Sequence, residues 1–152
     1  GRFDCAAGRH PGMGKTAMFT ILGIDHLVLR VSNLNRMLDF YLHLGCTLER
    51  ERPELGLYQL RAGNALIDLV TIDGPLGRTG GAPAETEGRN LDHFCLRIEP
   101  FDKAELDSLL TAMNLSTGCI ESRYGADGLG PSIYLKDPEG NTLELKGPPL
   151  HR

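Results

Sequence analysis

The sequence predicts an α+β fold of two tandem βαβββ modules, and three observations support this prediction. A stretch near the start of the chain, DHLVLRV at 25–31, returns as DHFCLRI at 92–98. A helical pattern of apolar residues follows each copy, and three strand-like runs follow each helix. Such self-similarity is typical of a duplicated supersecondary unit. We therefore expect the modules to form a curled mixed sheet around a central site.

In the first module the strand at 25–31 leads into an amphipathic helix. The helix is indicated by apolar residues at the spacing i, i+3, i+4, i+7, which are Leu34, Met37, Leu38 and Tyr41. Ser32 or Asn33 can cap its start, and Gly45 can end it. The strands that we expect next are 46–51, 56–60 and 65–72, with a turn at 61–64.

The second module repeats this order after its strand at 92–98. Asp102 and Glu105 have the spacing of a capping box. The helical pattern then consists of Leu106, Leu109, Leu110 and Met113. We expect strands at 117–122, 132–136 and 142–146, with a hairpin turn, DPEGN, at 137–141. The stretch 123–131 is expected to be a loop that helps to shape a pocket.

We divide the chain into one domain with two flanking segments. Residues 1–20 are rich in glycine without apolar periodicity, so we predict a disordered extension or a cloning remnant there. Within it, GKT at 14–16 resembles the end of a phosphate-binding loop, but Arg9 stands where the first glycine is needed. The domain spans 21–148, with module one at 21–72, a connection at 73–90 and module two at 91–148. Residues 149–152 are predicted to be a tail.

The composition excludes several classes of function. The chain has 152 residues, 41% of them hydrophobic, but no apolar run that could span a membrane. Its formal charge is -4 and its basic residues are scattered, so we expect no binding to nucleic acid or membranes. The four cysteines form no C-x-x-C pair, which argues against a cysteine zinc site and favours a cytoplasmic protein.

Four polar residues occupy matching places in the two modules. His26 and His93 lie near the start of the repeated strands, while Asp68 and Glu144 interrupt apolar runs in the last strands. A buried carboxylate is costly unless it is paired or bound to a metal. Each residue alone is more often structural, and Asp68 could pair with a neighbouring arginine. The matched set nevertheless predicts one divalent metal, Ni, Zn, Co, Mn or Fe, with two positions left for water or substrate.

Other residues on the same strand faces are predicted to contact a small-molecule substrate. Side chains two positions apart share a face of a strand. Arg30 therefore lies on the face of His26, while Cys95 and Arg97 lie on the face of His93. Tyr134, in a following strand, completes the predicted substrate-binding set. Either Tyr124 or Tyr134 could supply the acid or base that a ring-cleaving oxygenase needs.

The chain resembles the vicinal oxygen chelate superfamily, which includes glyoxalases, bleomycin-resistance proteins and extradiol dioxygenases. The resemblance covers about 21–148 and rests on DHLVLRV, on FY and LG at the end of the first helix, on LDHFCLRI at 91–98, and on DPEGNTLEL at 137–145. It implies paired βαβββ modules, a homodimer, and metal ligands at His26, His93 and Glu144. Asp68 stands where glyoxalase I-like members carry a glutamate, and Arg30 matches an arginine that holds a substrate carboxylate.

The resemblance implies a metal-dependent lyase or isomerase that moves a proton on a small oxygenated substrate. A divalent ion would stabilise the developing oxyanion, and Glu144 or Asp68 would act as the base. Two alternatives use the same ligands, namely an extradiol-type dioxygenase and a fosfomycin-type thiol transferase. A third is a metal-free protein that binds a drug, although the absence of tryptophan weakens it.

Overall fold

The computed structural model describes residues 17–150, so most of the predicted N-terminal extension and the end of the tail lie outside the described residues. Module one contains, in chain order, β1 (His26–Val31), α1 (Leu34–His43), β2 (Thr47–Arg52), the 3₁₀ turn η1 (Pro53–Leu55), β3 (Leu57–Ala62) and β4 (Ala65–Thr71). The connection holds the 3₁₀ turn η2 (Arg78–Gly80). Module two contains β5 (Phe94–Arg97), α2 (Lys103–Ala112), β6 (Glu121–Gly125), β7 (Gly128–Lys136) and β8 (Thr142–Lys146).

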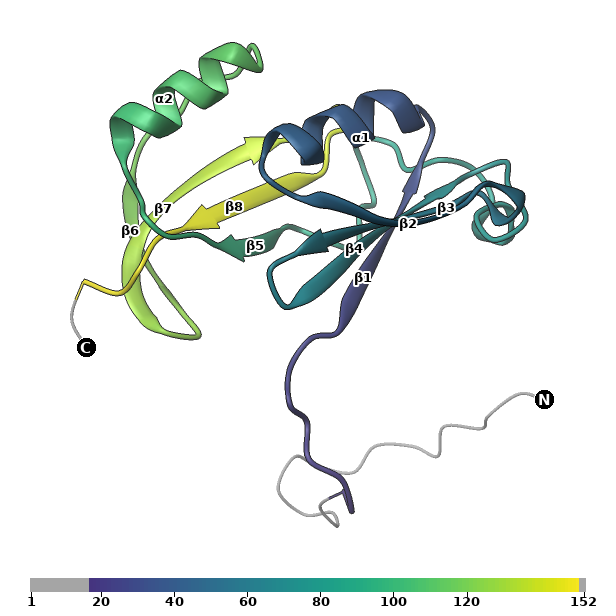
Figure 1. Cartoon of the computed structure of the whole chain (residues 1–152), viewed down its shortest axis with the longest axis horizontal. Helices are drawn as coiled ribbons and strands as arrows, with labels where there is room; N and C mark the ends of the chain where they lie inside the picture. The colour runs from purple at the N-terminus through teal and green to yellow at the C-terminus, as the bar shows by residue number, and fades with distance from the viewer. Residues whose placement is uncertain (1–16, 151–152) are drawn as a thin grey trace.

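The predicted α+β fold with two βαβββ modules is confirmed. Each module forms a four-stranded mixed sheet, with strand orders β1-β4-β3-β2 and β5-β8-β7-β6. In both sheets the first strand pairs in parallel with the last, and the other pairs are antiparallel. Both helices lie on the same side of the sheets (Figure 1). Neither of the helices within 17–150 has the length and apolar character needed to cross a membrane.

The helix boundaries follow from the capping residues. The Asn33 side chain accepts a hydrogen bond from the backbone of Arg36, and Asp102 accepts one from the backbone of Glu105. Gly45 has φ +110°, which a residue with a side chain rarely adopts, and it lies just after α1. The predicted capping residues are therefore confirmed in both modules.

The prediction of a loop at 123–131 is wrong, because this stretch forms the β6–β7 hairpin. Gly125 pairs with Gly128, so the turn between the strands has only two residues. Strand β6 also begins later than predicted, at Glu121, because Gly118 with φ +65° breaks the extended chain before it. A run of polar and glycine residues hid this hairpin, since it lacks the apolar alternation that marks a half-buried strand.

The core is one apolar cluster that includes side chains of both modules. Its members come from the helices and from the strand faces turned toward them, among them Val31, Met37, Tyr41, Leu60, Ile67, Leu110, Ile133 and Leu143. The ring of Tyr41 on α1 stacks against Phe94 of β5, with centroids 6.5 Å apart. The first helix of the chain therefore packs against the second module as well as its own.

The DPEGN turn between β7 and β8 joins the modules through hydrogen bonds. The buried Asp137 carboxylate accepts from the Tyr41 hydroxyl at 2.8 Å. The Glu139 carboxylate accepts from the backbone N–H groups of Ser32 and Asn33 at 2.7 to 3.0 Å, just before α1. A carboxylate at this end of a helix also interacts favourably with the helix dipole. This turn thus fixes how α1 sits on module two.

Candidate metal centre

The second module brings His93 and Glu144 together on one face of its sheet. Strand β5 follows directly after His93, and β8 carries Glu144 in the middle of an apolar run. The His93 Nε2 atom lies 3.3 Å from Glu144 Oε1. The other ring nitrogen, Nδ1, lies 2.6 Å from the carboxylate of Asp92. Because that contact occupies Nδ1, the Nε2 atom is turned toward Glu144.

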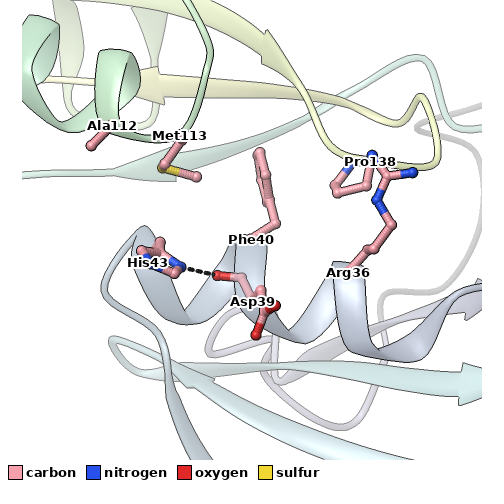
Figure 2. A pocket seen from close by; sticks show the side chains of 7 residues that line it. All are labelled: Arg36, Asp39, Phe40, His43, Ala112, Met113 and Pro138. Atoms are coloured by element: carbon pink, nitrogen blue, oxygen red, sulfur yellow. Dashed lines mark hydrogen bonds between the residues drawn. The ribbon is translucent and has the colours of Figure 1, made fainter.

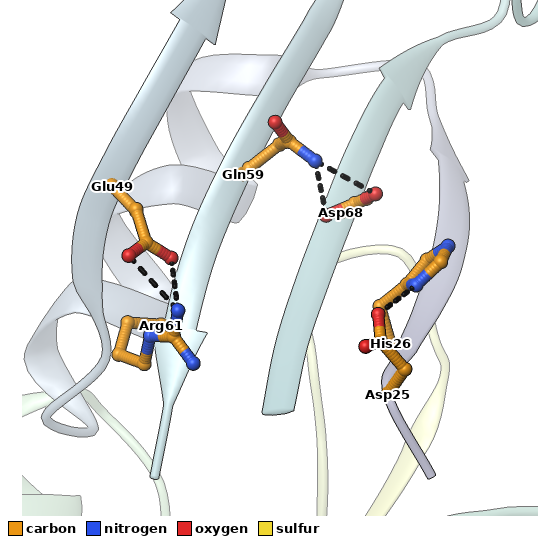
Figure 3. A network of polar contacts seen from close by, with 6 residues as sticks. All are labelled: Asp25, His26, Glu49, Gln59, Arg61 and Asp68. Atoms are coloured by element: carbon orange, nitrogen blue, oxygen red, sulfur yellow. Dashed lines mark hydrogen bonds and ion pairs between the residues drawn. The ribbon is translucent and has the colours of Figure 1, made fainter. Parts of the chain in front are cut away.

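The first module places His26 and Asp68 on the neighbouring strands β1 and β4, without the direct contact that joins His93 and Glu144 (Figure 3). The Nδ1 atom of His26 lies 2.6 Å from the Asp25 carboxylate, which matches the Asp92–His93 contact. Asp68 is 5% exposed, and the amide of Gln59 donates to both of its oxygens at 3.2 and 3.3 Å. The pKa of His26 is raised, mainly by the hydrogen bond with Asp25 and further by the nearby charge of Asp68.

The surroundings of Glu144 favour its charged form. Burial raises the pKa of Glu144. Hydrogen bonds from Ser132, Tyr134 and Cys95, together with the charge of His93, lower the pKa by more than burial raises it, so the net shift is downward. The Ser132 hydroxyl donates to Glu144 Oε2 at 2.8 Å. Burial, followed by the charge of Glu144, raises the pKa of the Cys95 thiol to about 12. The Glu144 carboxylate is therefore an anion that accepts several hydrogen bonds, and the Cys95 thiol beside it stays protonated.

This donor set fits a divalent metal ion. Two ligands about 2.1 Å from one ion and at right angles lie about 3 Å apart, close to the separation of His93 Nε2 and Glu144 Oε1. A histidine that ligates a metal through one ring nitrogen usually donates a hydrogen bond from the other, often to a carboxylate. His93 has such a contact with Asp92, and His26 has one with Asp25. Each module therefore offers one imidazole and one carboxylate that are suited to one side of a metal site.

Within one chain these residues form two separate pairs. The structure places His26 near Asp68 and His93 beside Glu144. Across residues 17–150, no three side chains of the types His, Cys, Asp or Glu lie close enough together to hold an ion. We call the two pairs the half-sites. One chain supplies both halves without joining them.

Comparison with known proteins identifies the family. The model of the Glyoxalase/Bleomycin resistance protein/Dioxygenase superfamily matches residues 23–145. The chain belongs to this superfamily. A virulence protein from Salmonella typhimurium is 25% identical, with a TM-score of 0.66 over 86% of this chain and 99% of that one. A lactoylglutathione lyase from Agrobacterium tumefaciens is 19% identical, with a TM-score of 0.57 over 84% of this chain and 94% of that one. A glyoxalase/bleomycin resistance protein/dioxygenase from Alicyclobacillus acidocaldarius is 22% identical, with a TM-score of 0.54 over 83% and 91% of the two chains.

Two of the predicted substrate-binding residues, Arg30 and Arg97, make hydrogen bonds within the protein. The Arg30 guanidinium donates to three backbone carbonyl oxygens of the connection, those of Gly77, Gly81 and Ala82. The Arg97 guanidinium pairs with carboxylates on both sides, Glu99 at 2.8 Å and Asp127 at 3.0 Å. The arginine near the end of each repeated strand thus holds a neighbouring segment of the same chain in place.

The other two predicted substrate-binding residues lie beside the His93–Glu144 half-site. The ring of Tyr134 meets the His93 ring edge-on, with centroids 5.3 Å apart. The Arg123 guanidinium lies over the same Tyr134 ring, 5.2 Å from its centroid. Cys95 pairs with Glu144 across β5 and β8. Both Tyr134 and Cys95 therefore belong to the wall around this half-site.

Sequence reasoning missed four residues that orient the half-sites, namely Asp25, Asp92, Gln59 and Ser132. The two aspartates had a visible signal, because each repeat contains the pair Asp-His and not histidine alone. No motif marks the other two. They orient the carboxylates from neighbouring strands, and only the strand pairing puts them there.

A separate apolar groove of about 230 Å³ lies on the helix side of this superfamily fold (Figure 2). Phe40 and Met113 form its apolar walls, while Arg36, Asp39 and His43 lie at its rim. The His43 ring binds the backbone oxygen of Asp39 at 2.6 Å. None of the half-site residues lines this groove.

Proposed function

We propose that this protein is a divalent-metal-dependent lyase or isomerase of the glyoxalase type that transfers a proton on a small oxygenated substrate. The observation that carries the proposal is the 3.3 Å approach of His93 Nε2 and Glu144 Oε1, with His93 anchored on Asp92. The matching contacts of His26 in the other module support it. Membership of a superfamily that includes glyoxalases and dioxygenases agrees with it.

We further propose that the metal ligands are His26, Asp68, His93 and Glu144, and that two chains share each site. The sheet edges support a homodimer. The outer edge strands β2 and β6 are charged, as exposed edges of natural sheets usually are. The other edge strands, β1, which begins at His26, and β5, which directly follows His93, are mostly apolar. A second copy lying along them would cover both edges and bring unlike half-sites together.

The chain's own residues have defined tasks in this scheme. A bound divalent ion would stabilise negative charge that develops on substrate oxygens. Asp92 and Asp25 hold the two imidazoles, and Ser132 holds one oxygen of Glu144. Glu144 or Asp68 would take the proton as general base. The apolar neighbours of these carboxylates limit the access of water.

Tyr134 favours an extradiol-type dioxygenase as the second candidate function. Ring cleavage of this kind needs an acid or base beside the metal ligands, and the Tyr134 ring lies against His93. Its pKa is raised, first by burial and then by its hydrogen bond with Glu144, so the hydroxyl keeps its proton at neutral pH. Iron or manganese, rather than nickel, cobalt or zinc, in the purified protein would favour this candidate.

Metal binding by purified variants tests the ligand assignment. We expect His93→Ala and Glu144→Ala to lose metal binding in calorimetric titration with Ni²⁺ or Mn²⁺ while keeping the wild-type circular dichroism. We expect Asp92→Asn to lower the affinity about 10- to 100-fold, because it removes only the partner of His93. His43→Ala is the matched control and should bind like wild type. Full metal occupancy in the two ligand variants would refute the assignment.

Mixing two inactive variants tests whether the site is shared. His26→Ala and Glu144→Ala damage opposite half-sites, so a mixed dimer keeps one complete site out of two. After subunit exchange, an equal mixture should recover about a quarter of the wild-type metal sites, since half of the dimers are mixed. A mixture that binds no more metal than its two components would exclude a site shared between two chains.

A further inference from the structure

An exposed apolar segment, residues 18–24, lies directly before β1, and we call it the arm. Its large apolar side chains are each at least 74% exposed, namely Met18, Phe19, Ile21, Leu22 and Ile24. The arm runs away from the body of the molecule (Figure 1), and among the described residues no hydrogen bond joins it to the rest of the chain. Monomeric soluble proteins rarely expose so continuous an apolar surface, and such surfaces mark sites of interaction with another molecule.

The free edge of β5 in a second copy offers this arm a place. Within 17–150, β5 is the outermost strand of its sheet, and only its other side is paired, with β8. Phe94, Leu96 and Ile98 pack against the core, yet all three are only half-buried. An added strand would therefore satisfy free backbone groups and cover apolar side chains at the same time.

Symmetry determines the direction in which the arm would run. In the proposed dimer the unlike half-sites meet, so His26 of one copy lies near His93 of the other. Two adjoining sheet edges present both half-sites on one face only if the local twofold axis is normal to the sheet, and such an axis makes the adjoining strands antiparallel. The residues before His26 then lie along the residues after His93, which are those of β5.

The alternation of side chains along the two strands fits this arrangement. With the two histidines opposite each other, Ile21 comes opposite Ile98, and both lie on the side that faces the helices. Ile24 comes opposite Cys95, on the side of the half-site, and Leu22 shares that side. The helix side thus pairs apolar with apolar side chains, while two further apolar side chains reach the half-site face.

We propose that the arm of one copy adds to the free edge of β5 in a second copy as an antiparallel strand. The exchange is reciprocal, so one dimer contains two such strands. Leu22 and Ile24 then form an apolar wall beside the partner's half-site, which suits a substrate with an apolar group next to its reacting atoms. The inference rests on the proposed function for the meeting of unlike half-sites.

Cross-linking of the full chain tests the position of the arm. Directly opposite residues in an antiparallel pair have Cβ atoms about 4.5–5.5 Å apart, so a small shift allows a disulfide. We expect the double variant Ile21→Cys, Ile98→Cys to form a covalent dimer on oxidation in air with Cu²⁺–phenanthroline, seen on a non-reducing gel. The matched control is Thr20→Cys with Ile98→Cys, because Thr20 would face the opposite side, and it should give about tenfold less covalent dimer. Wild type shows the background from the natural cysteines.

Removing one apolar side chain of the arm should weaken association. Ile21 is 81% exposed in the single chain, so we expect Ile21→Ser to keep the wild-type circular dichroism. Its dimer dissociation constant, measured by analytical ultracentrifugation, should rise about 100-fold or more, since each dimer would lose two buried isoleucines. Tyr124→Ser, also at an 81% exposed position, is the matched control and should associate like wild type.

Four results would overturn the proposal: no covalent dimer from the double variant, a disulfide within one chain instead, an equal yield from the Thr20→Cys control, or unweakened association of Ile21→Ser. The metal titration and the mixing of inactive variants are measured separately. A shared metal site without the cross-link would keep the proposed function and reject the arm. A cross-linked dimer that binds no metal would keep the arm and reject the metal ligands.

Discussion

Replacing Tyr41 by phenylalanine should measure how strongly the DPEGN turn holds the modules together. The Tyr41 side chain is fully buried, and its hydroxyl donates to Asp137 at 2.8 Å. A hydrogen bond to a charged group contributes about 1.5–3 kcal/mol. The Asp137 carboxylate would keep three other donors, from the backbone of Glu139 and Asn141 and the Asn141 side chain, so it would not be left unpaired. We therefore expect Tyr41→Phe to lower the free energy of unfolding by about 2 kcal/mol.

Urea unfolding at one fixed protein concentration is the assay, since the stability of the proposed dimer would depend on concentration. The midpoint should fall while the slope m stays constant, and the melting temperature should fall by about 4–8 °C. Tyr124→Phe is the control, because Tyr124 is 81% exposed and should stay within about 0.5 kcal/mol of wild type. If the two variants unfold at the same urea concentration, the hydrogen bond does not hold the modules together.

Three further substitutions test other contacts. Gly77→Ala should destabilise the protein by about 1–3 kcal/mol in a thermal melt, because the added Cβ would lie 1.9 Å from a backbone oxygen at the end of β4. The control Gly23→Ala, whose added Cβ would have no atom within 4 Å, should melt like wild type. Arg30→Met should release the connection from its three hydrogen bonds, seen as faster proteolytic cleavage at 77–82; an unchanged cleavage rate would contradict this. Glu139→Gln should lower the unfolding free energy by about 1 kcal/mol through the weaker cap on α1, while Glu87→Gln, on the exposed connection, should not.

Local patterns in the sequence were sufficient to predict the modules. The repeated strands, the helical spacing and the capping residues depend on neighbours within a few positions, and the structure confirms them. The β6–β7 hairpin was missed because glycines and polar residues replace the apolar alternation there. Its two-residue turn becomes evident only once Gly125 and Gly128 are seen to pair.

The candidate site could be predicted only in part, for a similar reason. The repetition singled out His26, His93 and the two carboxylates, but not their separation into two half-sites. That separation depends on how the modules dock, which rests on contacts such as Tyr41 with Asp137, 96 positions apart. The role of Arg30 also depends on the connection, whose sequence carries no motif.

The apolar edges of β1 and β5 would also matter before the two copies of the proposed homodimer meet. An unpaired strand edge offers its backbone groups to any extended peptide, and charged residues on β2 and β6 discourage this only at the outer edges. In the proposed homodimer, newly synthesised chains would thus be the ones most open to strand addition, because the edges of β1 and β5 stay uncovered until a partner copy binds.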